Sequence, residues 1–190
     1  MLISIAIAAY SFYKLHNIYT TNILIALIIC IIADVVIFFN FIGGTIIFAL
    51  GHIFYIYLLF KLNVSIKLFF LFFLLFTFVI FIIVYRNKKA LIKLLKTNNI
   101  ILALPFILYS LMLITLLSFS YSVAFVNTSV ENVLLCLGIN FFVISDITLV
   151  FNIIYPTNKT KERISLSFYY VGQFLIANAA LFSYIFSNTK

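Results

Sequence analysis

Charged residues are scarce in this chain. Only 8% of its 190 residues are Asp, Glu, Lys or Arg, and four of these are acidic, whereas 66% of the residues are hydrophobic. The mean hydropathy is +1.30. Soluble domains normally carry about 25% charged residues, because water requires a polar surface. The composition therefore excludes a water-soluble globular protein and indicates that lipid surrounds the folded chain.

Cysteine, proline and glycine are also rare, at two, two and five residues. Cys30 and Cys136 lie in separate apolar runs without the spacing of metal ligands, so they predict neither a disulfide framework nor a metal site. No Pro-, Gly- or Ser-rich segment and no shift of composition divides the chain. Residues 1–190 are therefore expected to form a single transmembrane helical domain without a cofactor.

Seven apolar runs approach or reach the length that crosses a bilayer, which is about 20 residues. A lipid-exposed strand would leave backbone groups unpaired, so these runs are predicted to be helices although they are rich in Ile, Phe and Val. The fold class is thus all-α, a polytopic membrane helix bundle of about seven transmembrane helices. The first run is short, and no basic segment precedes it as in a secretory signal, so we expect a retained helix. The runs are Leu2–Phe12, Asn22–Asn40, Gly43–Phe60, Ile66–Tyr85, Ile100–Phe119, Asn132–Tyr155 and Ser165–Phe186.

Basic residues predict the orientation of these helices in the cell membrane, because Lys and Arg accumulate on the cytoplasmic side. Eight of them lie in the loops Arg86–Asn99 and Pro156–Ile164 or at their ends, on the same side as the N-terminus, which is therefore predicted to be cytoplasmic. The net charge of +8 is not accompanied by interleaved aromatic and basic residues. It indicates contact with anionic membrane lipids rather than with nucleic acid. The other side has Lys14, Lys61, Lys67 and Lys190.

Two pairs of segments resemble each other and predict an internal repeat. In the first pair a small residue and an Asp are followed six positions later by Asn; in the second pair His52 aligns with Gln173. The two copies are separated by an even number of crossings, so they would run parallel through the membrane. The paired segments are IIADVVIFFN at Ile31–Asn40 with VISDITLVFN at Val143–Asn152, and ALGHIF at Ala49–Phe54 with YVGQFL at Tyr170–Leu175.

The repeat contains two of the four acidic residues. Asp34 and Asp146 lie deep in predicted spans, at similar depth toward the cytoplasmic half, whereas Glu131 and Glu162 lie at span ends. An unpaired acid near the bilayer centre costs about 2.5–3.5 kcal/mol, so such residues face a partner or a wet cavity and indicate function. The alternative is that each Asp only fixes helix packing through hydrogen bonds. His52 likewise fits either a hydrogen-bonding strut or a proton-transfer group.

These residues resemble the lysoplasmalogenase (YhhN-like) family. The family typically has eight helices and a Lys-Pro pair opening its second, so this chain is expected to lack the family's first helix and the start of the second. Ala33 stands where the family usually has Gly. The resemblance covers about residues 23–182. It is carried by Asp34, Gly43-Gly44, Gly51-His52-x-x-Tyr55, Pro105 with Tyr109, Gly138-x-x-Phe141-x-x-x-Ser145-Asp146, Pro156, and Tyr169-Tyr170-x-x-Gln173-x-Leu175-Ile176.

The resemblance implies hydrolysis of the vinyl-ether bond of a lysophospholipid substrate, a lysoplasmalogen, to a fatty aldehyde and a glycerophospho-headgroup. Asp34 and Asp146 would be the catalytic pair, one donating a proton and the other stabilising the oxocarbenium ion, as carboxyl pairs do in glycosidases. Their carboxyls are expected within about 10 Å of each other on neighbouring helices. No metal is expected. The substrate-binding or supporting candidates are His52, Tyr55, Asn140, Ser145, Tyr170 and Gln173.

Two other classes of protein fit the same residues. Parallel repeats with intramembrane Asp, His and Asn also describe a small proton- or cation-coupled transporter, in which the acids bind the cation. Such carriers use discontinuous helices, but the proline that lies within a span, Pro105, is not in either Asp-containing run. A purely structural membrane protein is the third class. For the hydrolase we expect an amphiphilic cavity from the two acids to the cytoplasmic face.

Overall fold

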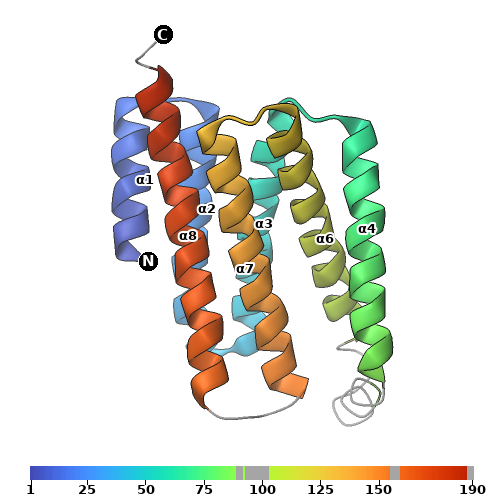
Figure 1. The fold of residues 1–190 in the computed structure, drawn as a ribbon. Coiled ribbons are helices and arrows are strands. Elements are labelled where there is room, and N and C mark those ends of the chain that lie inside the picture. Colours follow the sequence, from blue (N-terminus) through green and yellow to red (C-terminus); the bar gives the residue numbers. More distant parts are fainter. Residues whose placement is uncertain (89–91, 93–102, 155–158, 188–190) are drawn as a thin grey trace.

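The computed structural model describes residues 1–88, 92, 103–154 and 159–187. Its described part consists of helices connected by short turns (Figure 1). Most of the basic segment Arg86–Asn99, and the residues 155–158, lie outside the described residues. The helices are α1 (Leu2–Lys14), α2 (Ile18–Phe39), α3 (Phe41–Lys61), α4 (Ile66–Arg86), α6 (Ala103–Val126), α7 (Val130–Ile154) and α8 (Lys159–Ser187).

The apolar runs form helices whose starts are set by short polar residues. Asn17 accepts a hydrogen bond from the backbone N–H of Thr20 at 2.8 Å and begins α2, and Asn40 accepts one from Gly43 at 3.0 Å and begins α3. These side chains satisfy N–H groups that the first helical turn leaves unpaired. Asn40 directly follows α2, so a single residue ends one span and begins the next.

The expected membrane bundle is confirmed. Six described helices are long and apolar enough to span a membrane, whereas α1, with 13 residues, is about 20 Å long and is too short by itself. The span predicted to end at Phe119 continues to Val126. The following connection is therefore only residues 127–129, shorter than the loop expected up to Glu131.

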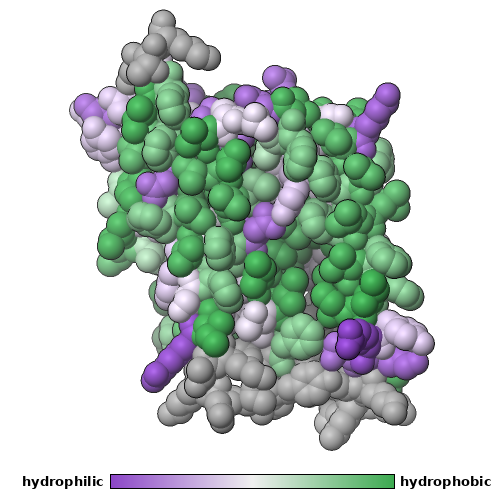
Figure 2. All heavy atoms as spheres, in the orientation of Figure 1, coloured by the Kyte–Doolittle hydropathy of each residue, from purple (hydrophilic) through white to green (hydrophobic). Residues whose placement is uncertain are grey.

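Five of the helices form a closed ring. Going around the ring, α2 packs on α3, α3 on α6, α6 on α7, α7 on α8, and α8 on α2. Helix α1 packs outside this ring against α2 and α8, and α4 packs outside it against α6 (Figure 1). On the face shown in Figure 2, apolar side chains cover most of the middle of the bundle, and polar side chains are more frequent near its ends. The ring interior is therefore the part of the molecule that is shielded from lipid.

The two halves of the predicted repeat pack alike. Helices α2 and α7 run in the same direction, as do α3 and α8 (Figure 1). A Cβ on Gly51 of α3 would lie 3.1 Å from Cys30 Sγ of α2, and a Cβ on Gly172 of α8 would lie 2.9 Å from the backbone nitrogen of Phe142 on α7. The sequence match aligns Gly51 with Gly172 and Cys30 with Phe142. Both helix pairs therefore cross at equivalent positions.

Candidate active site

Each of the five ring helices contributes side chains to one cluster inside the ring. The cluster lies in the half of the bundle where α2 and α7 end, which is also the end from which the connections α4 to α6 and α7 to α8 leave (Figure 1). Its members are Cys30 and Asp34 of α2, Phe48, His52 and Tyr55 of α3, Tyr109 of α6, Phe142 and Asp146 of α7, and Tyr169 and Gln173 of α8.

Asp146 is held by two groups. The hydroxyl of Tyr109 donates a hydrogen bond to Asp146 Oδ2 at 2.9 Å, and His52 Nε2 lies 3.6 Å from the same oxygen. The side chain of Asp146 is 13% exposed and that of His52 is fully buried. The carboxyl of Asp146 is therefore shielded and paired, as an intramembrane acid must be to avoid a large desolvation cost.

The surroundings of His52 indicate that its Nδ1 atom carries a hydrogen. His52 Nδ1 is 2.7 Å from the carbonyl oxygen of Phe48, which can only accept, so Nδ1 carries a hydrogen. His52 Nε2 then faces Asp146 and has no hydrogen-bond partner in the described part of the chain. A lone pair facing a carboxylate would be repulsive. A proton placed between His52 Nε2 and the Asp146 carboxyl, 3.6 Å away, would remove this repulsion, so the two groups are positioned to exchange one.

Asp34 has a different environment. Tyr169 donates a hydrogen bond to Asp34 Oδ2 at 3.1 Å, and the Asp34 side chain is half-buried. The Tyr169 ring meets the ring of Phe48 edge-on at 5.8 Å and that of Phe142 at 5.5 Å. These contacts leave the tyrosine little freedom, so it holds the carboxyl in a defined orientation.

The two acids belong to the same cluster, although their helices are not neighbours. The ring of Phe142 contacts both Tyr169 and His52, and the thiol of Cys30 is close enough to Asp34 and Asp146 to interact electrostatically with each. The expectation of adjacent Asp-containing helices is wrong, because α8 packs against both α2 and α7 and separates them. A separation of about 10 Å between the carboxyls stays a prediction.

Gln173 and Tyr55 form a buried pair about one helical turn along α8 and α3 from Tyr169 and His52. Tyr55 donates to Gln173 Oε1 at 3.1 Å, and both side chains are almost fully buried. Gln173 Nε2 has no oxygen or nitrogen acceptor within hydrogen-bond geometry among the described residues, and the thiol of Cys30 is its neighbour in the cluster. An unpaired buried amide N–H costs about 1–3 kcal/mol, which makes this group a candidate to bind water or substrate.

The remaining candidates from the sequence lie elsewhere. Ser145 exchanges hydrogen bonds with Ser165, each hydroxyl donating to the other residue's carbonyl at 2.9 Å, and so joins α7 to α8. Asn140 bonds Tyr121 and the carbonyl of Cys136, with no hydrogen bond to either acid among the described residues. Tyr170 is 44% exposed on the outer surface. The structure thus brings His52, Tyr55 and Gln173 to the cluster and leaves these three outside it.

Sequence reasoning missed Tyr109 and Tyr169 as site residues. Helical periodicity could have identified Tyr169, because it lies one turn before Gln173 and therefore on the same face of the helix. Tyr170 is about 100° further around the helix and faces elsewhere. Tyr109 carries no such signal, since α6 belongs to neither copy of the repeat.

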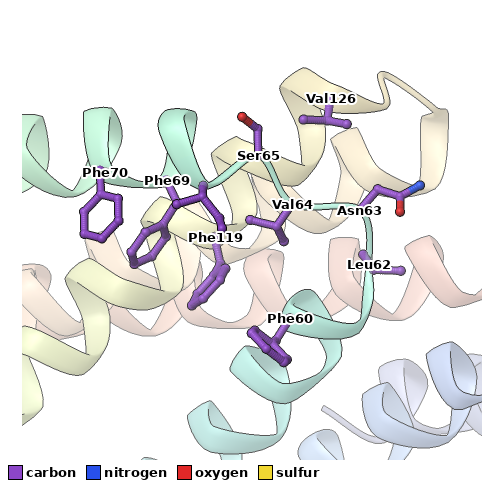
Figure 3. A pocket seen from close by; sticks show the side chains of 10 residues that line it. Phe60, Leu62, Asn63, Val64, Ser65, Phe69, Phe70, Phe119 and Val126 are labelled. Carbon is purple, nitrogen blue, oxygen red and sulfur yellow. The ribbon is translucent and has the colours of Figure 1, made fainter.

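A groove of about 670 Å³ lies away from this cluster, where α3 ends and α4 begins (Figure 3). It touches neither Asp34 nor Asp146. The cavity expected between the two acids and the cytoplasmic face therefore stays a prediction. No three His, Cys, Asp or Glu side chains in the described part of the chain are grouped as a metal site requires.

The fold is that of a polytopic α-helical membrane protein whose helix ring contains two aspartates, each hydrogen-bonded by a tyrosine. The model of the YhhN family matches residues 1–180, and the chain belongs to that family, which is associated with hydrolase activity. No curated protein and no solved structure matches the chain.

Proposed function

We propose that this protein hydrolyses the vinyl-ether bond of lysoplasmalogens. The observation that carries the proposal is the pair of intramembrane carboxyls in one shielded cluster, one of which lies 3.6 Å from His52 Nε2. Vinyl-ether hydrolysis needs a proton donor and a group that stabilises positive charge, and these two environments supply both. Because membrane lipid surrounds the helix bundle, a single-chain lipid is a suitable substrate.

The His52–Asp146 pair is the proton donor in this scheme. Its proton is transferred to the β-carbon of the vinyl ether, and the C=C electron pair forms the new C–H bond. The positive charge then resides on the oxocarbenium ion, O⁺=CH. After the transfer the pair is left as neutral imidazole and carboxylate, a state that Tyr109 stabilises through its hydrogen bond to Asp146 Oδ2.

Asp34 is the second carboxylate. Its negative charge stabilises the oxocarbenium ion, and it orients the water that adds to the cationic carbon and takes a proton from it. The resulting hemiacetal then loses its hydroxyl proton, its C–O bond to the glycerol oxygen breaks, and that oxygen takes up a proton, which gives a fatty aldehyde and a free hydroxyl on the headgroup. One water is consumed, and the proton returns to the His52–Asp146 pair.

Substrate access from the basic end of the bundle is part of the proposal. Asp34 and Asp146 lie in the second half of α2 and α7, toward the end where α4 stops at Arg86 (Figure 1). A phosphate headgroup would be attracted to the Lys and Arg residues of that end while the alkyl chain stays among apolar side chains.

Helix continuity favours the hydrolase over a carrier. Helices α2, α3 and α7 are each uninterrupted around Asp34, His52 and Asp146. Carriers typically bind their ions at breaks in transmembrane helices, where free backbone groups supply ligands.

Aldehyde release tests the proposal directly. Purified protein in detergent is incubated with a 1-alkenyl lysophospholipid, and the released aldehyde is quantified by mass spectrometry. Asp146→Asn and Asp34→Asn should each reduce the rate by about 10²-fold or more, the usual contribution of a general acid or base. Glu131→Gln, the same chemical change at a span end, should leave the rate near that of the wild type. The saturated 1-alkyl analogue should yield no aldehyde, because it has no double bond to protonate.

Two results contradict the proposal. One is the absence of aldehyde with wild-type protein over a range of alkenyl lipids. The other is an Asn variant of either acid that works as well as Glu131→Gln.

A further inference from the structure

The groove at the end of the bundle opposite the aspartates is a separate feature of the molecule. It lies where α3 ends, α4 begins and α6 ends (Figure 3). Along α6, Phe119 at the groove is ten residues from Tyr109 at the acid cluster, or about 15 Å of helix. The lining residues are Phe60, Leu62, Asn63, Val64, Ser65, Ile66, Phe69, Phe70, Phe119 and Val126.

Aromatic rings form the wall of this groove. Phe69 of α4 and Phe119 of α6 pack with ring centroids 4.4 Å apart, and Phe60 of α3 meets Phe119 edge-on at 6.3 Å. These three helices therefore present a continuous apolar surface. Such a surface fits an alkyl chain, because its rings offer dispersion contacts, while the polar lining residues Asn63 and Ser65 lie in the turn between α3 and α4.

Two lysines are the charged residues nearest in sequence to the lining of the groove. Lys61 and Lys67 are exposed and are the immediate sequence neighbours of lining residues, and Lys61 Nζ lies 5.4 Å above the ring of Tyr57. The nearest acid in the sequence is Glu131, in the first turn of α7 and five residues after the lining residue Val126. Lysines at a span end lie at the depth of lipid headgroups and attract anionic ones.

We propose that this groove binds an anionic phospholipid of the adjoining leaflet. One acyl chain lies along the phenylalanine wall, and the phosphate lies near Lys61 and Lys67. The site is distinct from the acid cluster, so the bound lipid is not the substrate of the proposed hydrolysis.

Lipid retention measured by native mass spectrometry tests this proposal. Protein is taken from micelles that hold equal amounts of phosphatidylglycerol and phosphatidylcholine with identical acyl chains. The wild type should retain phosphatidylglycerol preferentially. Each lysine removed should weaken retention about fivefold, so Lys61→Gln with Lys67→Gln should lower it by more than tenfold. Lys14→Gln is the matched control, since Lys14 is at the same end of the bundle but on α1, away from the groove.

Several outcomes would overturn the proposal. Equal retention of the two lipids by the wild type does so without any variant, and so does displacement of the lipid by soluble glycerol phosphate, which would indicate an anion site without a chain site. An equal loss in Lys14→Gln would show that general surface charge is responsible. Because retention is measured rather than aldehyde release, the result is independent of the proposed hydrolase activity.

Discussion

Replacing Gly172 with alanine tests the close approach of α7 and α8. The added Cβ would lie 2.8 Å from the carbonyl oxygen of Gly138 and 2.9 Å from the backbone nitrogen of Phe142. Both contacts are with backbone, which cannot rotate away. Raising the 2.8 Å contact to an ordinary 3.4 Å would require the helices to separate by about 0.6 Å. Overpacking of this kind typically costs about 1–3 kcal/mol in stability.

Gly43→Ala is the control for this substitution. A Cβ there would lie 3.4 Å from Asn40 Cγ, which is ordinary contact, so this variant should show only the gain of about 1 kcal/mol that alanine brings to a helix. Gly51→Ala should fall between them, because its 3.1 Å contact is with the Cys30 side chain, which can move. Stability is measured by unfolding in mixed micelles of increasing SDS content, followed by circular dichroism.

The order of stability should be Gly43→Ala, then Gly51→Ala, then Gly172→Ala. Aldehyde release should fall in Gly172→Ala, because residues 169 and 173 on either side of it would move relative to α7, and a displacement of about 1 Å at a site can cost 10²-fold in rate. Equal stability of Gly172→Ala and Gly43→Ala would refute the close crossing of α7 and α8.

Other substitutions test the tyrosine contact, the topology and a helix cap. Tyr169→Phe removes a hydrogen bond to a site carboxylate and should lower the rate of aldehyde release, whereas Tyr170→Phe, on the lipid-facing side, should not; equal rates would contradict a positioning role. Single cysteines introduced as Lys88→Cys and Thr128→Cys should react with an impermeant maleimide from the inside and the outside of the cell, respectively, and the reverse pattern would invert the predicted orientation. Asn17→Ala should destabilise the protein by about 0.5–2 kcal/mol through loss of the cap of α2, as measured by the same unfolding assay.

The helical bundle was predictable because the bilayer leaves few alternatives. Long apolar runs must satisfy their backbone groups internally, so Ile66–Arg86 is a helix even though Phe and Ile dominate it. The continuation of α6 through Ser120 and Ser122 was not predicted, since serines resemble a loop in sequence. In the structure Ser120 and Ser122 donate to backbone carbonyls, Ser122 to that of Ser65, so these polar groups are satisfied within the bundle.

The site was only partly predictable, for a geometric reason. Asp34 and Asp146 are conspicuous because acids are rare in this chain, and His52 and Gln173 follow from the repeat. Which helices lie side by side depends on packing over long sequence separations. The contact between Asp34 and Tyr169, 135 residues apart, leaves no local pattern in the sequence.

The polar contacts that Asp34, His52 and Gln173 make across the cluster run between the two copies of the repeat. Asp34 of the first copy is bonded by Tyr169 of the second, Asp146 of the second faces His52 of the first, and Tyr55 pairs with Gln173. A single two-helix unit would thus hold an acid without the group that orients it. If the chain is divided between α4 and α6 and the two fragments are co-expressed, the cluster that contains Asp34 and Asp146 should form only when both fragments are present.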